Sequence, residues 1–287
     1  MQIVSDRGMD MSPEQMQGLL IHLVPLTFTL DGKSYRSGVD IQPDEFYRLL
    51  EATPSFPNTS QPSPGDFAAL YRQLAATDPD ILSVHISSGL SGTLNSATTG
   101  AAMVPEARVT AWDTKTLSGA EGWQVEAAAR AARAGWPVDK IIDLMKRISA
   151  ATDTIYTLAT LKYLIHGGRI NHIKGLLAQV LNIKPLIGVE KEHGTYTQCG
   201  QARSLDKAIL KLADYVAARF APGTAMRFQV MDGHNLEGAA MLCERLAQLF
   251  KCTFLPTCTI APVLGAHTGP GLVGVAFAPM AAFPEMP

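Results

Sequence analysis

The sequence predicts an α/β protein built from two α/β domains. The first observation is a strand, helix, strand, helix succession in the first half, since such alternation produces a parallel sheet through right-handed crossovers. These four segments are residues 81–86, 93–103, 108–114 and 119–134. The alternation resumes after residue 150, and 287 residues with 47% hydrophobic content can bury two moderate cores. We expect domains at 1–150 and 151–287, the first with a mainly parallel sheet flanked by helices.

The remaining segments follow from periodicity and turn residues. Residues 21–30 read as a strand entering a tight turn and 33–39 as its return, which predicts a small β-hairpin at about 21–40. A proline near its first turn favours a short helix over 42–50, and apolar residues recur at helical spacing over 138–148. The second domain is expected to hold strands at 154–159, 226–231, 252–260 and 272–277 and helices at 204–220 and 236–250.

Charge and composition argue against several classes of function. A net charge of −2 and a pI near 6.4 give no field that would attract nucleic acid or an anionic membrane. Residues 1–8 lack the apolar core of a signal peptide, so we expect a cytoplasmic protein. The uncharged stretch 252–283 is broken by prolines and glycines, so no integral membrane segment is expected. Four cysteines without CxxC spacing predict neither a disulfide scaffold nor a metal site.

The turn at residues 87–93 has the composition of an anion-binding site. It joins an apolar strand to a helix, where backbone N–H groups lack helical partners and the helix dipole is positive. Gly89 and Gly92 let the main chain approach a ligand, and the hydroxyls of Ser88, Ser91 and Thr93 add donors. The alternative is a tight turn whose serines cap their own helix.

Three further segments carry unusual local chemistry. The hydroxyl-rich stretch 58–63 is either a site or a loop with a helix cap. A Gly-Gly pair precedes Arg169 and is expected to end a helix and point this guanidinium outward, within a local basic patch that suits an acidic partner or is simply solvated. His267 lies in a glycine-rich turn between apolar strands, where a ligand or another chain segment can come close, although a lone histidine is more often structural.

At these residues the sequence resembles the DegV family, bacterial fatty-acid-binding proteins that serve as the FakB-type subunit of fatty acid kinase. The resemblance spans nearly the whole chain, and it is the order and spacing of the motifs that make it specific. These motifs are Val24-Pro25-Leu26-Thr27, Asp31-Gly32-Lys33-Ser34-Tyr35, Gly38-Val39-Asp40-Ile41, Thr59-Ser60-Gln61-Pro62-Ser63, Ser87 to Thr93 with Asn95-Ser96-Ala97, Gly167-Gly168-Arg169-Ile170, Asn182-Ile183-Lys184-Pro185, and His267 with Gly269-Pro270-Gly271. Members usually carry Asp-Ser-Thr after the first strand, whereas this chain has Ser5-Asp6-Arg7-Gly8.

The resemblance implies a long-chain fatty acid, such as a C16 or C18 chain, in a cleft between the two domains. By motif, the residues around its carboxylate are Thr59, Ser60, Ser91, Gly92, Thr93 and His267. The tail needs an apolar tunnel, for which Leu176, Leu177, Val180, Leu181, Ile183, Leu186 and the strands expected over 263–277 are candidates. At about 0.8 kcal/mol per buried methylene, a tail of ~14 methylenes represents about 11 kcal/mol before ordering costs. The tail should therefore contribute most of the affinity, and the head group should mainly fix the orientation of the ligand.

The resemblance also implies a separate ATP-dependent kinase that phosphorylates the carboxylate. The chain has no G-x-x-x-x-G-K-[ST] loop and no evident acidic cluster for magnesium, so we expect a carrier without catalytic residues, cofactor or metal. Arg169, His172 and Lys174 would then face the kinase or the new phosphate.

Two other functions stay open at this point. Ser91, Asp113 and His267 occur in the chain order of an α/β-hydrolase triad, so a serine hydrolase of lipid or small esters is the alternative. The segment Gly89-Leu90-Ser91-Gly92-Thr93 departs from Gly-x-Ser-x-Gly, however. A lipid sensor that uses the same pocket is the third possibility.

Overall fold

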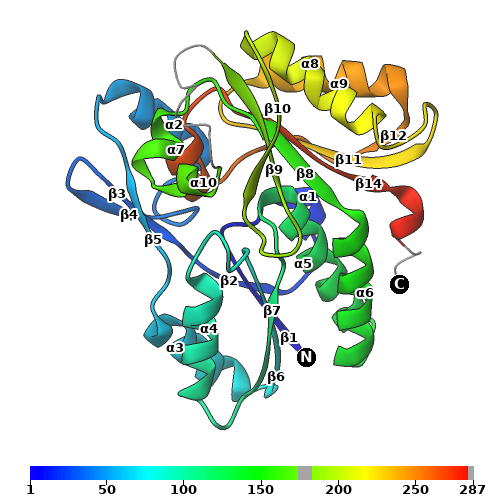
Figure 1. Cartoon of the computed structure of the whole chain (residues 1–287). Helices are drawn as coiled ribbons and strands as arrows, with labels where there is room; N and C mark the ends of the chain where they lie inside the picture. The colour runs from blue at the N-terminus through cyan, green and yellow to red at the C-terminus, as the bar shows by residue number, and fades with distance from the viewer. Residues whose placement is uncertain (174–182, 284–287) are drawn as a thin grey trace.

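The structure is an α/β fold organised around two large sheets (Figure 1). It is a computed structural model and describes residues 1–173 and 183–283. Within them lie a four-stranded parallel sheet, a seven-stranded mixed sheet and a small three-stranded antiparallel sheet. The predicted α/β class is confirmed, and the boundary between domains at residue 150 stays a prediction.

The parallel sheet comes from the first half of the chain and has the strand order β2-β1-β6-β7. Its strands are β1 (Gln2–Asp6), β2 (Ile21–Val24), β6 (Asp80–His85) and β7 (Arg108–Asp113). Helices α3 (Pro64–Ala75) and α4 (Thr93–Ala102) pack on one face through an apolar cluster that contains Phe67, Tyr71 and Ala97. The strand, helix, strand, helix prediction is therefore confirmed to within one or two residues.

The mixed sheet comes from the second half and has the order β10-β9-β8-β14-β11-β12, with β13 also paired to β11. Its strands are β8 (Asp153–Thr157), β9 (Lys184–Val189), β10 (Tyr196–Ala202), β11 (Ala225–Asp232), β12 (Lys251–Phe254), β13 (Cys258–Thr259) and β14 (Val273–Pro279). Helices α8 (Leu205–Ala217) and α9 (Leu236–Leu249) cover its outer face in Figure 1. The hairpin β9–β10 is an addition to the predicted elements.

Helix α5 (Ser118–Arg133) lies between the two large sheets and contacts strands of both. Nearly all of its residues are buried, and many are alanine or glycine, which allows close approach on every side. Helix α6 (Val138–Ala151) packs along it. The layers therefore alternate helix, sheet, helix, sheet, helix, and the inner layer adjoins the cavities described below.

The predicted hairpin at about 21–40 is only partly correct. Residues 21–30 form two strands in different sheets, because Pro25 has no N–H to continue a ladder. The first of them, β2, joins the parallel sheet, while β3 (Thr27–Leu30) pairs with β4 (Lys33–Arg36) as the true hairpin. On its other side β3 pairs with β5 (Asn58–Ser60).

The expectation of strands throughout 263–277 is wrong for its first half. Pro262 occupies the first turn of a helix, α10 (Pro262–Thr268), and Gly269 ends it with a φ of 69°. His267 thus lies in the last helical turn and not in a turn between strands. The other helices are α1 (Pro13–Met16), α2 (Pro43–Ala52), α7 (Lys162–His166) and the 3-10 turns Arg169–His172 and Met280–Ala282.

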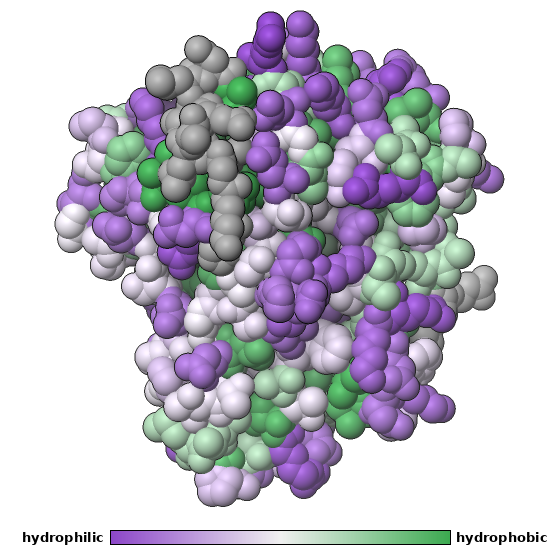
Figure 2. Space-filling model, viewed as in Figure 1, coloured by the Kyte–Doolittle hydropathy of each residue, from purple (hydrophilic) through white to green (hydrophobic). Residues whose placement is uncertain are grey.

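The face shown in Figure 2 mixes hydrophilic and hydrophobic residues without one dominant apolar patch. Within residues 1–173 and 183–283, no helix has both the length and the apolar character needed to cross a membrane.

Candidate functional site

A polar pocket brings together residues from six separate parts of the chain. Thr59, Ser60, Gln61, Ser91, Arg169 and His267 line it, together with Leu26, Ile86, Leu90, Tyr196, Val263 and Leu264. It contains about 430 Å³ of empty space, a figure that includes space open to solvent. Four of the predicted head-group residues, Thr59, Ser60, Ser91 and His267, line this pocket.

Local geometry explains how three of these side chains converge. Thr59 is the middle residue of β5 and pairs with the buried Phe28, so strand alternation turns its side chain inward and that of Ser60 outward. Ser91 belongs to the turn between β6 and α4, at the carboxyl edge of the parallel sheet. His267 comes from the last turn of α10. Ligands of α/β sheets bind at this edge.

His267 lines the polar pocket, and its surroundings determine its protonation state. Its Nε2 lies 2.9 Å from Thr59 Oγ1, and its buried Nδ1 has no hydrogen-bond partner. Burial, with smaller effects of the nearby Arg169 and His166, lowers the pKa of His267 to about 3. The imidazole is therefore neutral at physiological pH. A Cβ on Gly167 would lie 2.1 Å from Nδ1, so only glycine fits there.

The predicted anion-binding turn uses many of its donors internally. Ser91 Oγ lies 2.8 Å from Thr93 Oγ1 and accepts a hydrogen bond from Thr93 N–H, so Ser91 is bonded within the turn and also lines the polar pocket, while Gly92 is the N-cap of α4. Thr93 is fully buried, and Gly92 packs against the Gln61 side chain. Ser88 donates to Asp113. The turn is therefore partly satisfied by its own hydroxyl groups, although no side chain caps α4, and the carboxylate-binding role of Ser91 stays a prediction, whereas Ser88 is bound elsewhere.

Arg169 was predicted to point outward, but it lies at this site. The Gly-Gly pair ends α7 as expected, and Gly168 has a φ of 75°. Arg169 then donates from Nη1 to the Gly167 carbonyl oxygen at 2.7 Å, and its side chain lines the polar pocket. His172 ends the 3-10 turn that Arg169 begins, and Lys174 lies outside the described residues.

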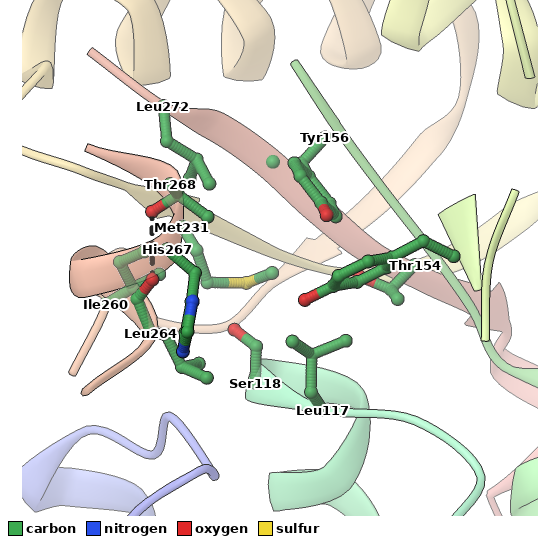
Figure 3. Close-up of a pocket in the computed structure, with 12 residues that line it drawn as sticks. Leu117, Ser118, Thr154, Tyr156, Met231, Ile260, Leu264, His267, Thr268 and Leu272 are labelled. Carbon is green, nitrogen blue, oxygen red and sulfur yellow. Dashed lines mark hydrogen bonds between the residues drawn. The ribbon is translucent and has the colours of Figure 1, made fainter. Parts of the chain in front are cut away.

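An apolar cavity adjoins the polar pocket (Figure 3). It contains about 440 Å³ of empty space, a figure that includes space open to solvent, and shares Tyr196, Leu264 and His267 with that pocket. In Figure 3 its walls come from Leu117 and Ser118 at the start of α5, from Tyr156 and Met231 on the mixed sheet, and from α10. The remaining lining residues are Thr154, Ile260, Thr268, Leu272 and Gly274.

The sequence located this apolar cavity only in part. Of the segment 263–277, Leu264, His267, Thr268, Leu272 and Gly274 line it. Leu186 packs instead into the core beneath α8 and α9, and Ile183 packs against the central core. Leu176, Leu177, Val180 and Leu181 fall outside the described residues. Tyr156, Tyr196 and Met231 were missed, because a residue on a buried strand looks the same in sequence whether it lines a cavity or fills a core.

The hydrogen bonds of the predicted hydrolase triad do not connect its members. His267 Nε2 is paired with Thr59 and not with Ser91. Asp113 accepts hydrogen bonds from Ser88 and from Lys115 N–H, on the other side of the turn. In the described part of the chain there is also no group of three or more His, Cys, Asp or Glu side chains that could hold a metal ion. The arrangement suits binding of a molecule with a polar head and an apolar body.

Known proteins share both the sequence and this fold. The family model described as "Uncharacterised protein, DegV family" matches residues 1–280. A DegV domain-containing protein of Deinococcus radiodurans is 36% identical over 284 residues, which are 98% of this chain and 99% of the relative. A solved DegV family protein from Thermus thermophilus, described by its fatty acid binding, has a TM-score of 0.86 at 29% identity and covers 97% of this chain and 99% of its own. DegV of Bacillus subtilis, described as a fatty acid binding protein, has a TM-score of 0.85 at 26% identity, with 97% and 98% covered. This chain therefore belongs to the DegV family.

Proposed function

We propose that this protein binds a long-chain fatty acid, with the carboxylate in the polar pocket and the tail in the apolar cavity. The observation that carries the proposal is the junction of the two spaces at His267 and Leu264. A ligand there would meet hydroxyl groups at one end and aliphatic and aromatic side chains at the other. The relatives described as fatty acid binding proteins support the same ligand class. The lining residues come from both predicted domains, 1–150 and 151–287, so the ligand would lie between them.

The protonation of His267 decides how the head group would be held. A proton on Nδ1 would be a buried donor with no acceptor, since Nδ1 lies against Gly167. We therefore place the proton on Nε2, which then donates to Thr59 Oγ1. The Thr59 hydroxyl proton is left for the carboxylate, and the Ser91 hydroxyl can supply a second. The N-terminus of α4 further favours an anion.

We also propose that the protein acts as a carrier that presents the carboxylate to a separate ATP-dependent kinase. Arg169 is at the polar pocket, where a guanidinium could contact an acidic partner or the new acyl phosphate. Because ATP would be the co-substrate, we expect the complex to work in the cytoplasm. His172 and Lys174, chosen from the sequence alone, are the further candidates for contact with this partner.

Mass spectrometry of lipid extracted from the purified protein tests the binding proposal. We expect a retained fatty acid in stoichiometric amount, and Ser91→Ala and His267→Ala should retain less after delipidation and reloading with palmitate. Arg203→Ala, at an exposed arginine outside both spaces, is the control. Extracts without fatty acid, together with no palmitate uptake on reloading, would refute the proposal.

The presentation step needs a separate assay, acyl phosphate formation with the ATP-dependent kinase. Arg169→Ala should bind palmitate as the wild type does but lose most acyl phosphate formation, with Arg203→Ala again as the control. Equal loss of binding and phosphorylation would remove the partner-facing role of Arg169. Covalent labelling of Ser91 by a fluorophosphonate would instead favour the hydrolase.

A further inference from the structure

A second cleft, separate from the polar pocket and the apolar cavity, opens beside Arg7. This Arg7 cleft contains about 1360 Å³ of empty space, part of which is open to solvent. Its lining includes Arg7 after β1, the segment around α1, the loop before α2 and the segment before α10. None of its lining residues is shared with the polar pocket or the apolar cavity. It is therefore a distinct space with its own chemistry.

Arg7 carries a positive charge without a counter-charge. Its Nε is buried and has no hydrogen-bond partner. In the part of the chain that the structure describes, no carboxylate forms an ion pair with it. Burial lowers the pKa of the Arg7 guanidinium, but an arginine stays protonated in proteins. A partly buried guanidinium with unused donors is costly unless an acceptor arrives from outside.

The local backbone leaves room for the guanidinium against a glycine. Gly38 has a φ of 68°, and a Cβ on it would lie 3.3 Å from Cζ, Nε and Nη1 of Arg7. A side chain at position 38 would therefore crowd the group. Arg7 and Gly38 both line the cleft.

The titratable groups around the Arg7 cleft already have other partners. Asp10 accepts hydrogen bonds from Ser118 Oγ and Ala261 N–H, and burial raises its pKa to about 7. Hydrogen bonds from its own N–H and from Ser12 lower the pKa of Glu14, which is exposed. Burial raises the pKa of the Cys258 thiol to about 12, so it is neutral. None of them neutralises Arg7.

Part of the lining is suited to an apolar body. Seven of the eighteen lining residues are methionines or prolines, and methionine side chains adapt to ligands of varied shape. These residues are Met9, Met11, Met16, Pro13, Pro43, Pro256 and Pro262. We propose that the Arg7 cleft binds an amphipathic anion, with a phosphate or carboxylate head on the Arg7 guanidinium and an apolar body along the methionines. A guanidinium can hold either oxyanion through two parallel hydrogen bonds.

Titration calorimetry with octyl phosphate on palmitate-loaded protein tests this second site. Loading with palmitate, confirmed by mass spectrometry, occupies the proposed fatty acid site. We expect octyl phosphate to bind, excess palmitate not to displace it, and Arg7→Gln to weaken it by roughly ten- to hundredfold. Arg203→Gln should leave its affinity unchanged. Inorganic phosphate, titrated alone, tests whether the anion binds without an apolar body. Octanol, which has no charge, should not compete with octyl phosphate.

A second variant keeps the test decisive if Arg7→Gln does not fold. Gln42 is exposed, lines the Arg7 cleft and donates from Nε2 to the Gly38 carbonyl oxygen at 3.4 Å. Gln42→Glu keeps its shape and adds a carboxylate that should compete for Arg7, so octyl phosphate should bind more weakly. Binding unaffected by either variant, binding by octanol equal to that of octyl phosphate, or no binding at all would overturn the proposal. If palmitate does not load, the fatty acid proposal fails while the dependence on Arg7 is still measurable.

Discussion

The polar pocket and the Arg7 cleft are both equipped for anions, but in opposite ways. In the polar pocket the imidazole is neutral, Arg169 is hydrogen-bonded to the backbone, and hydroxyl groups supply the donors. In the Arg7 cleft the donor is an arginine whose Nε has no partner. The hydrogen bond from Ser118 to Asp10 lies between the apolar cavity and the Arg7 cleft, because Ser118 lines the first and Asp10 the second. A chain can thus recognise acids either by oriented neutral groups or by charge.

Among the substitutions that test this contrast between the two sites, Gly167→Ala is expected to have the largest effect on palmitate affinity. A Cβ there would overlap Nδ1 of His267, so Gly167→Ala must displace the imidazole and with it the orientation of Thr59. Overpacking and the lost hydrogen bonds together should weaken palmitate binding by about a hundredfold. Fluorescence competition with a labelled fatty acid measures the affinity, and octyl phosphate binding should not change.

Gly65→Ala is the matched control for this substitution. Its nearest atom would be Ser63 Oγ at 3.6 Å, an ordinary contact. Palmitate affinity should then equal that of the wild type. Full palmitate affinity in Gly167→Ala would mean that His267 does not set the head-group geometry.

A smaller effect is expected from removing the Thr59 hydroxyl. Thr59→Val keeps the volume but leaves His267 Nε2 without a partner and the carboxylate without a donor. A hydrogen bond to a charged group contributes about 1.5 kcal/mol or more, so affinity should fall about tenfold. Thr59→Ser should recover most of it. Equal affinities of the valine and serine variants would show that the hydroxyl does not bind the ligand.

Asp10, which lies between the apolar cavity and the Arg7 cleft, should make the stability of the protein depend on pH. Its pKa is about 7 in the folded protein, against 3.8 for an ordinary aspartate, mainly because of burial. Between pH 4 and 7 the folded state keeps a proton that the unfolded chain has released, so raising the pH through this window destabilises the protein. Asp10→Asn cannot titrate and should gain in melting temperature relative to the wild type from pH 5 to pH 8. A constant difference between the two proteins would contradict the raised pKa.

The smallest effect concerns salt. Because the polar pocket relies mainly on neutral donors, palmitate affinity should change less than about twofold between 0.05 and 0.5 M salt. Octyl phosphate at Arg7 should lose several-fold over the same range. Calorimetry at both salt concentrations compares them, and equal salt dependence would remove the distinction.

The sequence predicted those features that depend on local pattern. Alternation of strand and helix gave the parallel sheet, and motif resemblance gave Thr59, Ser91 and His267, which the fold brings into one pocket. What it missed depends on contacts between distant segments. A proline in the first turn made α10 a helix, although its apolar residues also fit a strand.

The burial that sets the protonation state of a side chain could not be predicted from the sequence either. The neutral state of His267 results mainly from burial, and one of the residues packed against it is Gly167, which lies far from it along the chain. The missing partner of Arg7 could be recognised only once the surrounding carboxylates were placed. The segment Ser5 to Gly8 departs from the family pattern in sequence. That its Arg7 lines a cleft could be recognised only in the structure.

A crystal structure of the protein with palmitate tests the central claim most directly. We predict a carboxylate oxygen about 3 Å from both Thr59 Oγ1 and Ser91 Oγ, with the tail passing His267 into the cavity beside Tyr156 and Met231. A carboxylate bound at Arg7, or an alkyl chain outside that cavity, would contradict the account.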